Sequence, residues 1–200
     1  MAKIIDGKLI SSKIKEEIKQ EVDVLKTNGI NPTLAVILVG EDPASMVYVN
    51  NKEKTCNALG IESKVYRLEE TTTTEELLAL IDKLNKDNSV HGILLQHPVP
   101  SQIDEKLAFN TILPEKDVDG FNPLSKLNPC TPYGIIKYLR HLNFNFVGKN
   151  AVVVGRSNIV GRPMNTLLIN ESCNVTVLHS KTKKEDMAMY LCFIQHIIWS

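Results

Sequence analysis

Short apolar runs alternate with amphipathic segments along the first part of the chain. Apolar residues recur at helical spacing between runs that have the length of buried strands. This strand–helix alternation predicts a parallel sheet covered by helices, because parallel strands need long crossover connections. The predicted elements are helix 11–28, strand 34–39, helix 43–59, strand 64–68, helix 73–86, strand 92–96 and helix 101–112.

Capping residues set the expected starts of these helices. Ser11 and Ser101 are expected to cap the first and the last helix, and Thr73 is expected to form a capping box with Glu76. Asp42 stands before a proline at the first helical position, where the fixed φ of proline is favourable. The helix after Asp42 is therefore expected to start directly behind the first strand.

A loop rich in Pro, Asp and Asn over residues 114–131 marks the expected domain boundary. We predict one domain over residues 1–120 and a second over residues 121–200. The second domain is expected to contain a helix and then a β-α-β unit. Its predicted elements are helix 132–142, strand 151–154, a helix ending at residue 169 and strand 175–178.

A strand that ends in a glycine-containing turn is the most informative local feature of the second domain. Gly155 ends the strand and Gly161 opens the next helix, in the pattern G-x-S-x-x-x-G-x-P. The free N–H groups of a helix start suit a phosphate, and Arg156 and Arg162 would add positive charge. We predict a phosphate-rich cofactor here, with an ordinary strand-to-helix turn as the alternative.

Charge and cysteine usage narrow the class of protein. Lys plus Arg and Asp plus Glu are each 23, so no net basic field favours nucleic acid or an anionic membrane. The N-terminal residues do not have the pattern of a signal peptide. The four cysteines form no C-x-x-C pair, which argues against zinc and disulfides. We expect a protein of the cytoplasm, or alternatively of an organelle matrix, without a metal.

Tyr48 and Lys52 are the first candidates for chemistry. They lie four residues apart, so a helix would place both side chains on one face. That helix follows a strand, and α/β proteins bind ligands beyond the carboxyl ends of their strands. A lysine acts as general acid or base when burial or a neighbouring cation lowers its pKa. The alternative is a solvated lysine beside a packing tyrosine.

Three further polar residues stand at the end of the third predicted strand or after it. Gln96 closes an apolar run, where its amide needs a partner such as Lys52 or a ligand. His97 precedes a proline and is interpreted as a turn residue rather than a base. Asp119 could accept two N–H groups from an amino-pyrimidine ring, with a turn or an ion pair as the alternative.

The end of the last predicted strand bears on the choice of dinucleotide. Ser180 and Lys181 follow that strand, at the place where an acidic residue would favour NAD. Hydroxyl and cationic groups instead favour the 2′-phosphate of NADP. The sequence therefore predicts NADP over NAD.

Four segments together resemble the bifunctional methylenetetrahydrofolate dehydrogenase/methenyltetrahydrofolate cyclohydrolase family. They run in family order from about Ile5 to Lys183. The resemblance implies an α/β fold with a three-layer, parallel-sheet folate-binding domain and an incomplete Rossmann-like NAD(P)-binding domain. The segments are VGEDPASMVYVNNKEKTCNALGI, GILLQHPVP, PEKDVDGFNP with PCTPYGI, and GKNAVVVGRSNIVGRPMNTLLI with VTVLHSKT.

The same resemblance implies an activity and a role for each candidate residue. 5,10-Methylenetetrahydrofolate would be oxidised with NADP, and the methenyl product would be hydrolysed to 10-formyltetrahydrofolate. Lys52 would transfer protons while Gln96 holds it. Tyr48 would pack over the pterin and Asp119 would bind the pterin ring. The dinucleotide would be held by Gly155, Arg156, Ser157, Gly161 and Ser180.

Departures from the family leave alternatives open. His97 stands where an apolar residue is usual, and the loop between Phe121 and Pro129 is shorter than usual. The resemblance is expected to end near Lys183, so that the dinucleotide-binding domain would be truncated. A non-catalytic remnant that still binds folate or a partner is the alternative to an active enzyme. A homodimer is the expected assembly if one forms.

Overall fold

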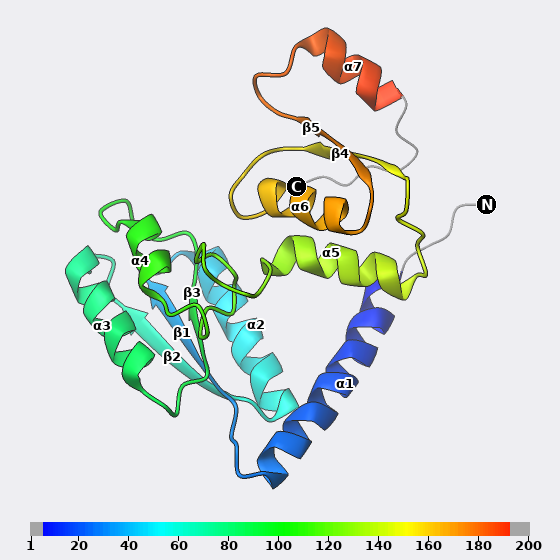
Figure 1. Ribbon diagram of the computed structural model, residues 1–200. Coiled ribbons are helices and arrows are strands. Elements are labelled where there is room, and N and C mark those ends of the chain that lie inside the picture. Colours follow the sequence, from blue (N-terminus) through cyan, green and yellow to red (C-terminus); the bar gives the residue numbers. More distant parts are fainter. Residues whose placement is uncertain (1–5, 193–200) are drawn as a thin grey trace. The chain divides into compact units, whose positions relative to one another are not determined.

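The computed structural model describes residues 6–192, whose helices and strands are drawn in Figure 1. The chain divides into two compact units, residues 1–127 (unit 1) and residues 128–200 (unit 2). The expected boundary after residue 120 lies inside unit 1. In chain order, unit 1 contains α1 (Gly7–Thr27), β1 (Thr33–Val39), α2 (Pro43–Leu59), β2 (Glu62–Leu68), α3 (Thr74–Lys86), β3 (Gly92–Leu95) and α4 (Glu105–Thr111).

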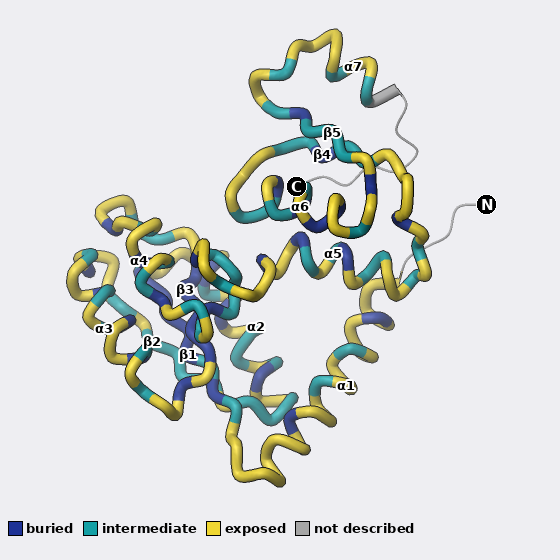
Figure 2. The backbone as a smooth tube through the Cα atoms, viewed as in Figure 1, coloured by how far each residue is buried: buried dark blue, intermediate teal, exposed yellow. Residues whose placement is uncertain are grey.

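A parallel sheet in the strand order β2-β1-β3 forms the middle layer of unit 1. The central strand β1 pairs with both neighbours, so that Ile37 lies opposite Tyr66 on one side and Leu95 on the other. Figure 2 shows buried residues concentrated on β1 and β3, with exposed residues on the outer surfaces of the helices. The predicted parallel sheet is confirmed.

Side chains of β1 alternate between two apolar layers, as expected for a strand buried on both faces. Ala35, Ile37 and Val39 belong to the core formed with α3 and α4. Val36 and Leu38 pack on the opposite face with apolar residues of α2. Unit 1 is therefore the three-layer α/β arrangement that the resemblance implied.

Two of the predicted helix starts are confirmed. α2 begins behind Asp42, whose carboxylate accepts the Ser45 N–H at 2.7 Å. The hydrogen bonds from Ser45 hold the pKa of Asp42 below its usual range. α3 begins with a reciprocal capping box between Thr73 and Glu76. Both starts place a side-chain acceptor on N–H groups that the helix itself leaves unpaired.

The two predicted serine caps are wrong. Ser11 lies inside α1, because Asp6 accepts two main-chain N–H groups and starts the helix earlier. Ser101 lies before α4, which Asp104 caps instead. In both cases a carboxylate is the acceptor, and hydrogen bonds to a charged acceptor are stronger than those to a hydroxyl.

Unit 2 is a β-α-β unit preceded by a helix. Its two strands pair in parallel, with Val154 opposite Leu178 at the carboxyl end. Ile136, Met164 and Val153 form one apolar core between the helices and the strands. No helix among residues 6–192 is long and apolar enough to cross a membrane. Unit 2 contains α5 (Cys130–His141), β4 (Asn150–Val154), α6 (Gly161–Asn170), β5 (Asn174–Leu178) and α7 (Lys184–Cys192).

We expect Thr73→Ala to lower the free energy of unfolding by about 1 kcal/mol. The substitution removes the hydroxyl that accepts the Glu76 N–H at 3.3 Å, so this N–H loses its protein partner. Urea denaturation followed by circular dichroism measures the difference. Thr71→Ala, in the exposed segment before the helix, is the matched control. Equal stability of the two variants would contradict the capping role.

Candidate functional site

Three of the predicted residues lie at the carboxyl edge of the sheet in unit 1. α2 follows β1 and places Tyr48 and Lys52 about one turn apart. Gln96 follows β3, and its main-chain N–H donates to the carbonyl of Ile37 in β1 at 2.8 Å. Because β1 and β3 are parallel, both leave the sheet at the same edge.

A hydrogen bond joins Lys52 to Gln96. Lys52 Nζ donates to Gln96 Oε1 at 3.0 Å. Gln96 Nε2 donates in turn to the carbonyl of His97 at 2.7 Å, so both ends of the amide have partners. Only 9% of Gln96 is exposed, which makes these partners necessary. Of the two partners that the sequence left open for Gln96, Lys52 or a ligand, the structure shows Lys52.

His97 lies in the bend after β3, as predicted, and it makes a contact that the sequence did not predict. Its ring Nδ1 contacts the carboxylate of Glu105 in the first turn of α4. Its carbonyl is the acceptor for Gln96. His97 therefore supports the Gln96 amide through its main chain rather than through its ring.

Tyr48 exposes most of its side chain beside Lys52. The residue is 63% exposed, so the alternative of a tyrosine packed into the core is wrong. An exposed aromatic ring offers a face on which a planar ligand can stack. On the other side of Lys52, burial raises the pKa of the Cys56 thiol, and the charge of Lys52 opposes that shift.

The segment just before Asp119 is paired with β3. Ile93 of β3 forms a parallel bridge with Asp117, and its N–H donates to the carbonyl of Lys116 at 2.7 Å. Asp119 follows this bridge by two residues, in a bend where its main-chain N–H donates to Asp117 Oδ1 at 3.2 Å. The structure thus places Asp119 in a loop that is anchored to β3 through Asp117.

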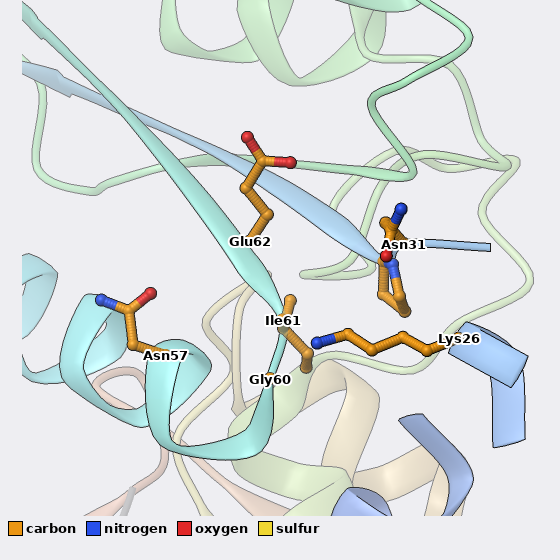
Figure 3. A pocket seen from close by; sticks show the side chains of 7 residues that line it. Lys26, Asn31, Asn57, Gly60, Ile61 and Glu62 are labelled. Atoms are coloured by element: carbon orange, nitrogen blue, oxygen red, sulfur yellow. The ribbon is translucent and has the colours of Figure 1, made fainter. Parts of the chain in front are cut away.

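A separate hollow of about 340 Å³ lies at the opposite edge of the sheet. Asn31, just before β1, and Ile61, just before β2, belong to its lining. Figure 3 shows the ammonium group of Lys26 reaching toward Gly60 and Ile61. The hollow contains none of the predicted site residues and stands at the amino ends of the strands, so it is not part of the candidate site.

In unit 2, the turns that follow β4 and β5 leave the sheet at one edge. Val154 and Leu178 are paired, and the Gly155 N–H donates to the carbonyl of Leu178 at 2.8 Å. Arg156 and Ser180 each come two residues after this pair. The structure therefore brings the predicted phosphate turn and the predicted ribose contact to the same edge.

Ser157 accepts hydrogen bonds from the first main-chain N–H groups of α6. Its Oγ accepts the N–H groups of Val160 and Gly161, both at 3.2 Å, and its carbonyl accepts that of Arg162 at 3.0 Å. The prediction of free N–H groups at this helix start is therefore wrong. In the part of unit 2 that the structure describes, the main-chain N–H groups of residues 156–159 are instead without hydrogen-bond partners. The open donors lie in the turn before the helix.

The turn also depends on a close approach between two glycines. A Cβ on Gly161 would lie 2.6 Å from the carbonyl oxygen of Gly155 and 2.8 Å from Cα of Arg156. Only glycine at this position leaves the main chain room to close the turn. Open N–H groups beside Arg156 and Arg162 fit an anionic, phosphate-bearing cofactor.

Asp117 and Asn122 are buried polar residues. The sequence reasoning considered Asp117 only as one of an acidic pair with Asp119, and it missed Asn122. They flank Asp119 and hold its loop by hydrogen bonds. The Asp-x-x-Gly spacing from Asp117 to Gly120 was the available signal, because aspartate commonly bonds main-chain groups a few residues on in a turn.

Comparison with known proteins identifies the family. The family model for the catalytic domain of tetrahydrofolate dehydrogenase/cyclohydrolase matches residues 5–119, and the model for its NAD(P)-binding domain matches residues 129–192. This chain belongs to the tetrahydrofolate dehydrogenase/cyclohydrolase family. The second match continues to residue 192, so the expectation that the resemblance ends near Lys183 is wrong.

Close relatives agree with this assignment. The bifunctional protein FolD of Agathobacter rectalis is 55% identical over 192 residues, covering 92% of this chain and 69% of the relative. The crystal structure of bifunctional FolD from Campylobacter jejuni is 48% identical with a TM-score of 0.90, over 92% of this chain and 69% of that one. The Trypanosoma brucei enzyme, solved with NADP cofactor and inhibitor, is 32% identical with a TM-score of 0.93, over 100% and 71%.

We expect Gly161→Ala to destabilise unit 2 by about 1–3 kcal/mol, because the added methyl group meets main-chain atoms that cannot rotate away. Gly134→Ala is the matched control. Gly134 lies inside α5 with no atom within 4 Å of an added Cβ, so alanine there should stabilise by about 0.5–1 kcal/mol. Amide hydrogen exchange of the two variants measures both effects, and the same sign for both would contradict this account.

Proposed function

We propose that this chain binds tetrahydrofolate derivatives at the carboxyl edge of unit 1 and performs both reactions implied by its family. These are the oxidation of 5,10-methylenetetrahydrofolate with NADP and the hydrolysis of the methenyl product to 10-formyltetrahydrofolate. The observation that carries the proposal is the Lys52–Gln96 hydrogen bond beside the exposed ring of Tyr48. This arrangement would place a proton-transfer group and a stacking surface about one turn apart on α2.

Lys52 is the proposed proton-transfer group of the hydrolysis. Water adds to the methenyl carbon, and the neutral amine of Lys52 takes the proton that this water loses. The ammonium returns that proton to N5 of the folate as the bond between this nitrogen and the carbon breaks. The remaining hydroxyl proton leaves to solvent as the formyl carbonyl forms. Gln96 would orient Nζ for this proton transfer through the hydrogen bond that its Oε1 accepts.

NADP is the proposed cofactor of unit 2. When bound, it accepts the hydride that leaves the methylene carbon. Gly155 and Gly161 would keep side chains away from the phosphates, and Arg156 would supply positive charge. Ser157 would act by shaping the turn, since its hydroxyl already accepts two N–H groups. Ser180 would contact the 2′-phosphate from the turn after β5.

Absorbance spectroscopy of the purified chain tests the proposal. With 5,10-methylenetetrahydrofolate and NADP, formation of NADPH and of the methenyl product would support both activities. Hydrolysis of added 5,10-methenyltetrahydrofolate without NADPH formation would support the unit 1 chemistry alone. Folate binding without either reaction would favour the alternative of a non-catalytic folate-binding protein. A cytoplasmic location and a homodimer stay predictions, the latter testable by analytical ultracentrifugation.

We expect Lys52→Met to reduce kcat for hydrolysis of 5,10-methenyltetrahydrofolate by about a hundredfold or more, because the general acid–base group is lost. Folate binding should remain largely intact, since methionine keeps the apolar stem. Lys54→Met is the matched control, because Lys54 is an exposed lysine of the same helix. Unchanged turnover in the Lys52 variant would remove this lysine from the mechanism.

We expect Ser180→Asp to weaken NADP binding by about tenfold or more through repulsion of the 2′-phosphate. NAD binding should change little, because NAD lacks that phosphate. Isothermal titration with each dinucleotide measures the difference. Ser172→Asp, at the amino end of β5, is the control, and its φ of 66° is one that aspartate tolerates. Equal losses for NADP and NAD would count against a role for Ser180 in selecting between them.

A further inference from the structure

A buried carboxylate lies under the loop that carries Asp119. Asp117 is only 2% exposed. Its Oδ1 accepts the N–H groups of Asp119 at 3.2 Å and of Gly120 at 3.0 Å. Its Oδ2 accepts the N–H of Asn122 at 2.8 Å. One side chain therefore binds three of the four residues from 119 to 122 through their main chain.

These three hydrogen bonds account for the burial of the charge. A buried carboxylate is costly unless its oxygens have donors. Lys116, the adjacent residue in the chain, does not supply one, because its ammonium donates to the carbonyls of Leu84 and Asp87. The burial of Asp117 is thus coupled to the conformation of the loop, and a different path of residues 119–122 would leave the carboxylate without these donors.

Asp117 is itself fixed to the sheet. Its main chain forms the parallel bridge with Ile93 of β3. The next residue, Val118, packs directly over Gly92, where an added Cβ would lie 2.5 Å from Val118 Cγ1. The carboxylate therefore projects from a rigid base.

Asn122 fixes the far end of the loop. Its Nδ2 donates to the carbonyl of Asn110 in the last turn of α4, at 3.2 Å, and to that of Ile112 just after the helix, at 2.8 Å. Its Oδ1 accepts the Leu124 N–H at 2.8 Å. Between the two anchored ends, Gly120 has a φ of +69°, which turns the chain back immediately after Asp119.

We propose that Asp117 is the positioning residue for Asp119, holding that side chain in the orientation that binds the pterin ring. The inference rests on the proposed function, because it gives Asp119 its role as the folate contact. Asp117 touches no substrate in this proposal. It acts by preventing the segment 119–122 from rotating, so that folate does not have to order the loop when it binds.

A double-mutant cycle on the full chain tests this role. Asp117→Asn keeps the size of the side chain but replaces one acceptor oxygen with an NH₂ group that faces a main-chain N–H. We expect it to raise the Kd for tetrahydrofolate by about tenfold. In an Asp119→Asn background, the same substitution should change the Kd by less than about twofold, because the residue through which it acts has already been altered.

Kinetics separate positioning from a general loss of structure. For hydrolysis of 5,10-methenyltetrahydrofolate, Asp117→Asn should raise KM more than it lowers kcat, since Lys52 and Gln96 keep their own hydrogen bond. Ser125→Ala is the matched control, because it removes a hydrogen bond to the Asp117 main chain and leaves the carboxylate unchanged. Its KM and its Kd for tetrahydrofolate should stay near those of the unsubstituted chain.

Each other result overturns the inference. An unchanged Kd in Asp117→Asn, or an equal rise in both backgrounds, would show that Asp117 does not act through Asp119. If Asp117→Asn does not fold by circular dichroism, Gly120→Ala takes its place in the cycle, because alanine is strained at the φ of Gly120. Failure of the unsubstituted chain to bind tetrahydrofolate would overturn the proposed function, and this inference with it.

Discussion

The two-sided pairing of β1 is the constraint on which unit 1 depends. A strand buried on both faces and paired on both edges cannot shift its register without moving two apolar layers to the wrong side. The residues that leave its carboxyl end are therefore fixed in position. The Asp42 cap starts α2 directly behind β1, so the position of β1 also fixes the position of α2 and of Lys52 within it. Gln96 follows β3, which leaves the sheet at the same edge. The 3.0 Å hydrogen bond between Lys52 and Gln96 depends on both placements.

Elements that rest on local chemistry were predictable from the sequence. The apolar run of β1, the Asp42-Pro43 helix start and the Thr73–Glu76 capping box each specify their structure within a few residues. The Lys52–Gln96 contact spans a longer separation, and the sequence offered it as one of two possibilities, the other being a ligand. A glutamine at the end of an apolar strand needs a hydrogen-bond partner, and Lys52 was the candidate on the helix that follows the neighbouring strand.

The sequence did not predict which of several nearby side chains would accept the main-chain N–H groups of a helix start or turn. Ser11 and Asp6 both suit the start of α1, and the sequence alone does not say which one meets the free N–H groups. Ser157 was predicted to contact the dinucleotide, but in the folded turn its hydroxyl accepts two main-chain N–H groups of its own chain. Asp117 precedes the predicted Asp119 by two residues, and only its burial and the hydrogen bonds of its carboxylate show that its side chain faces inward. In each case the deciding fact is the path of the main chain in three dimensions.

The two units hold their candidate groups by different means, and this bears on how the two reactions depend on each other. In unit 1, the proposed proton-transfer lysine and its partner contact each other through side chains of α2 and of the residue after β3. In unit 2, main-chain N–H groups and close glycine contacts form the turn that is proposed to hold the phosphates. The hydrolysis, as proposed, needs a bound folate, water and Lys52, and the Lys52–Gln96 contact is made within unit 1. The oxidation additionally needs a hydride acceptor that the residues of unit 2 would hold. The hydrolysis is therefore the reaction whose proposed proton-transfer pair lies within one unit, whereas the oxidation would also require the dinucleotide.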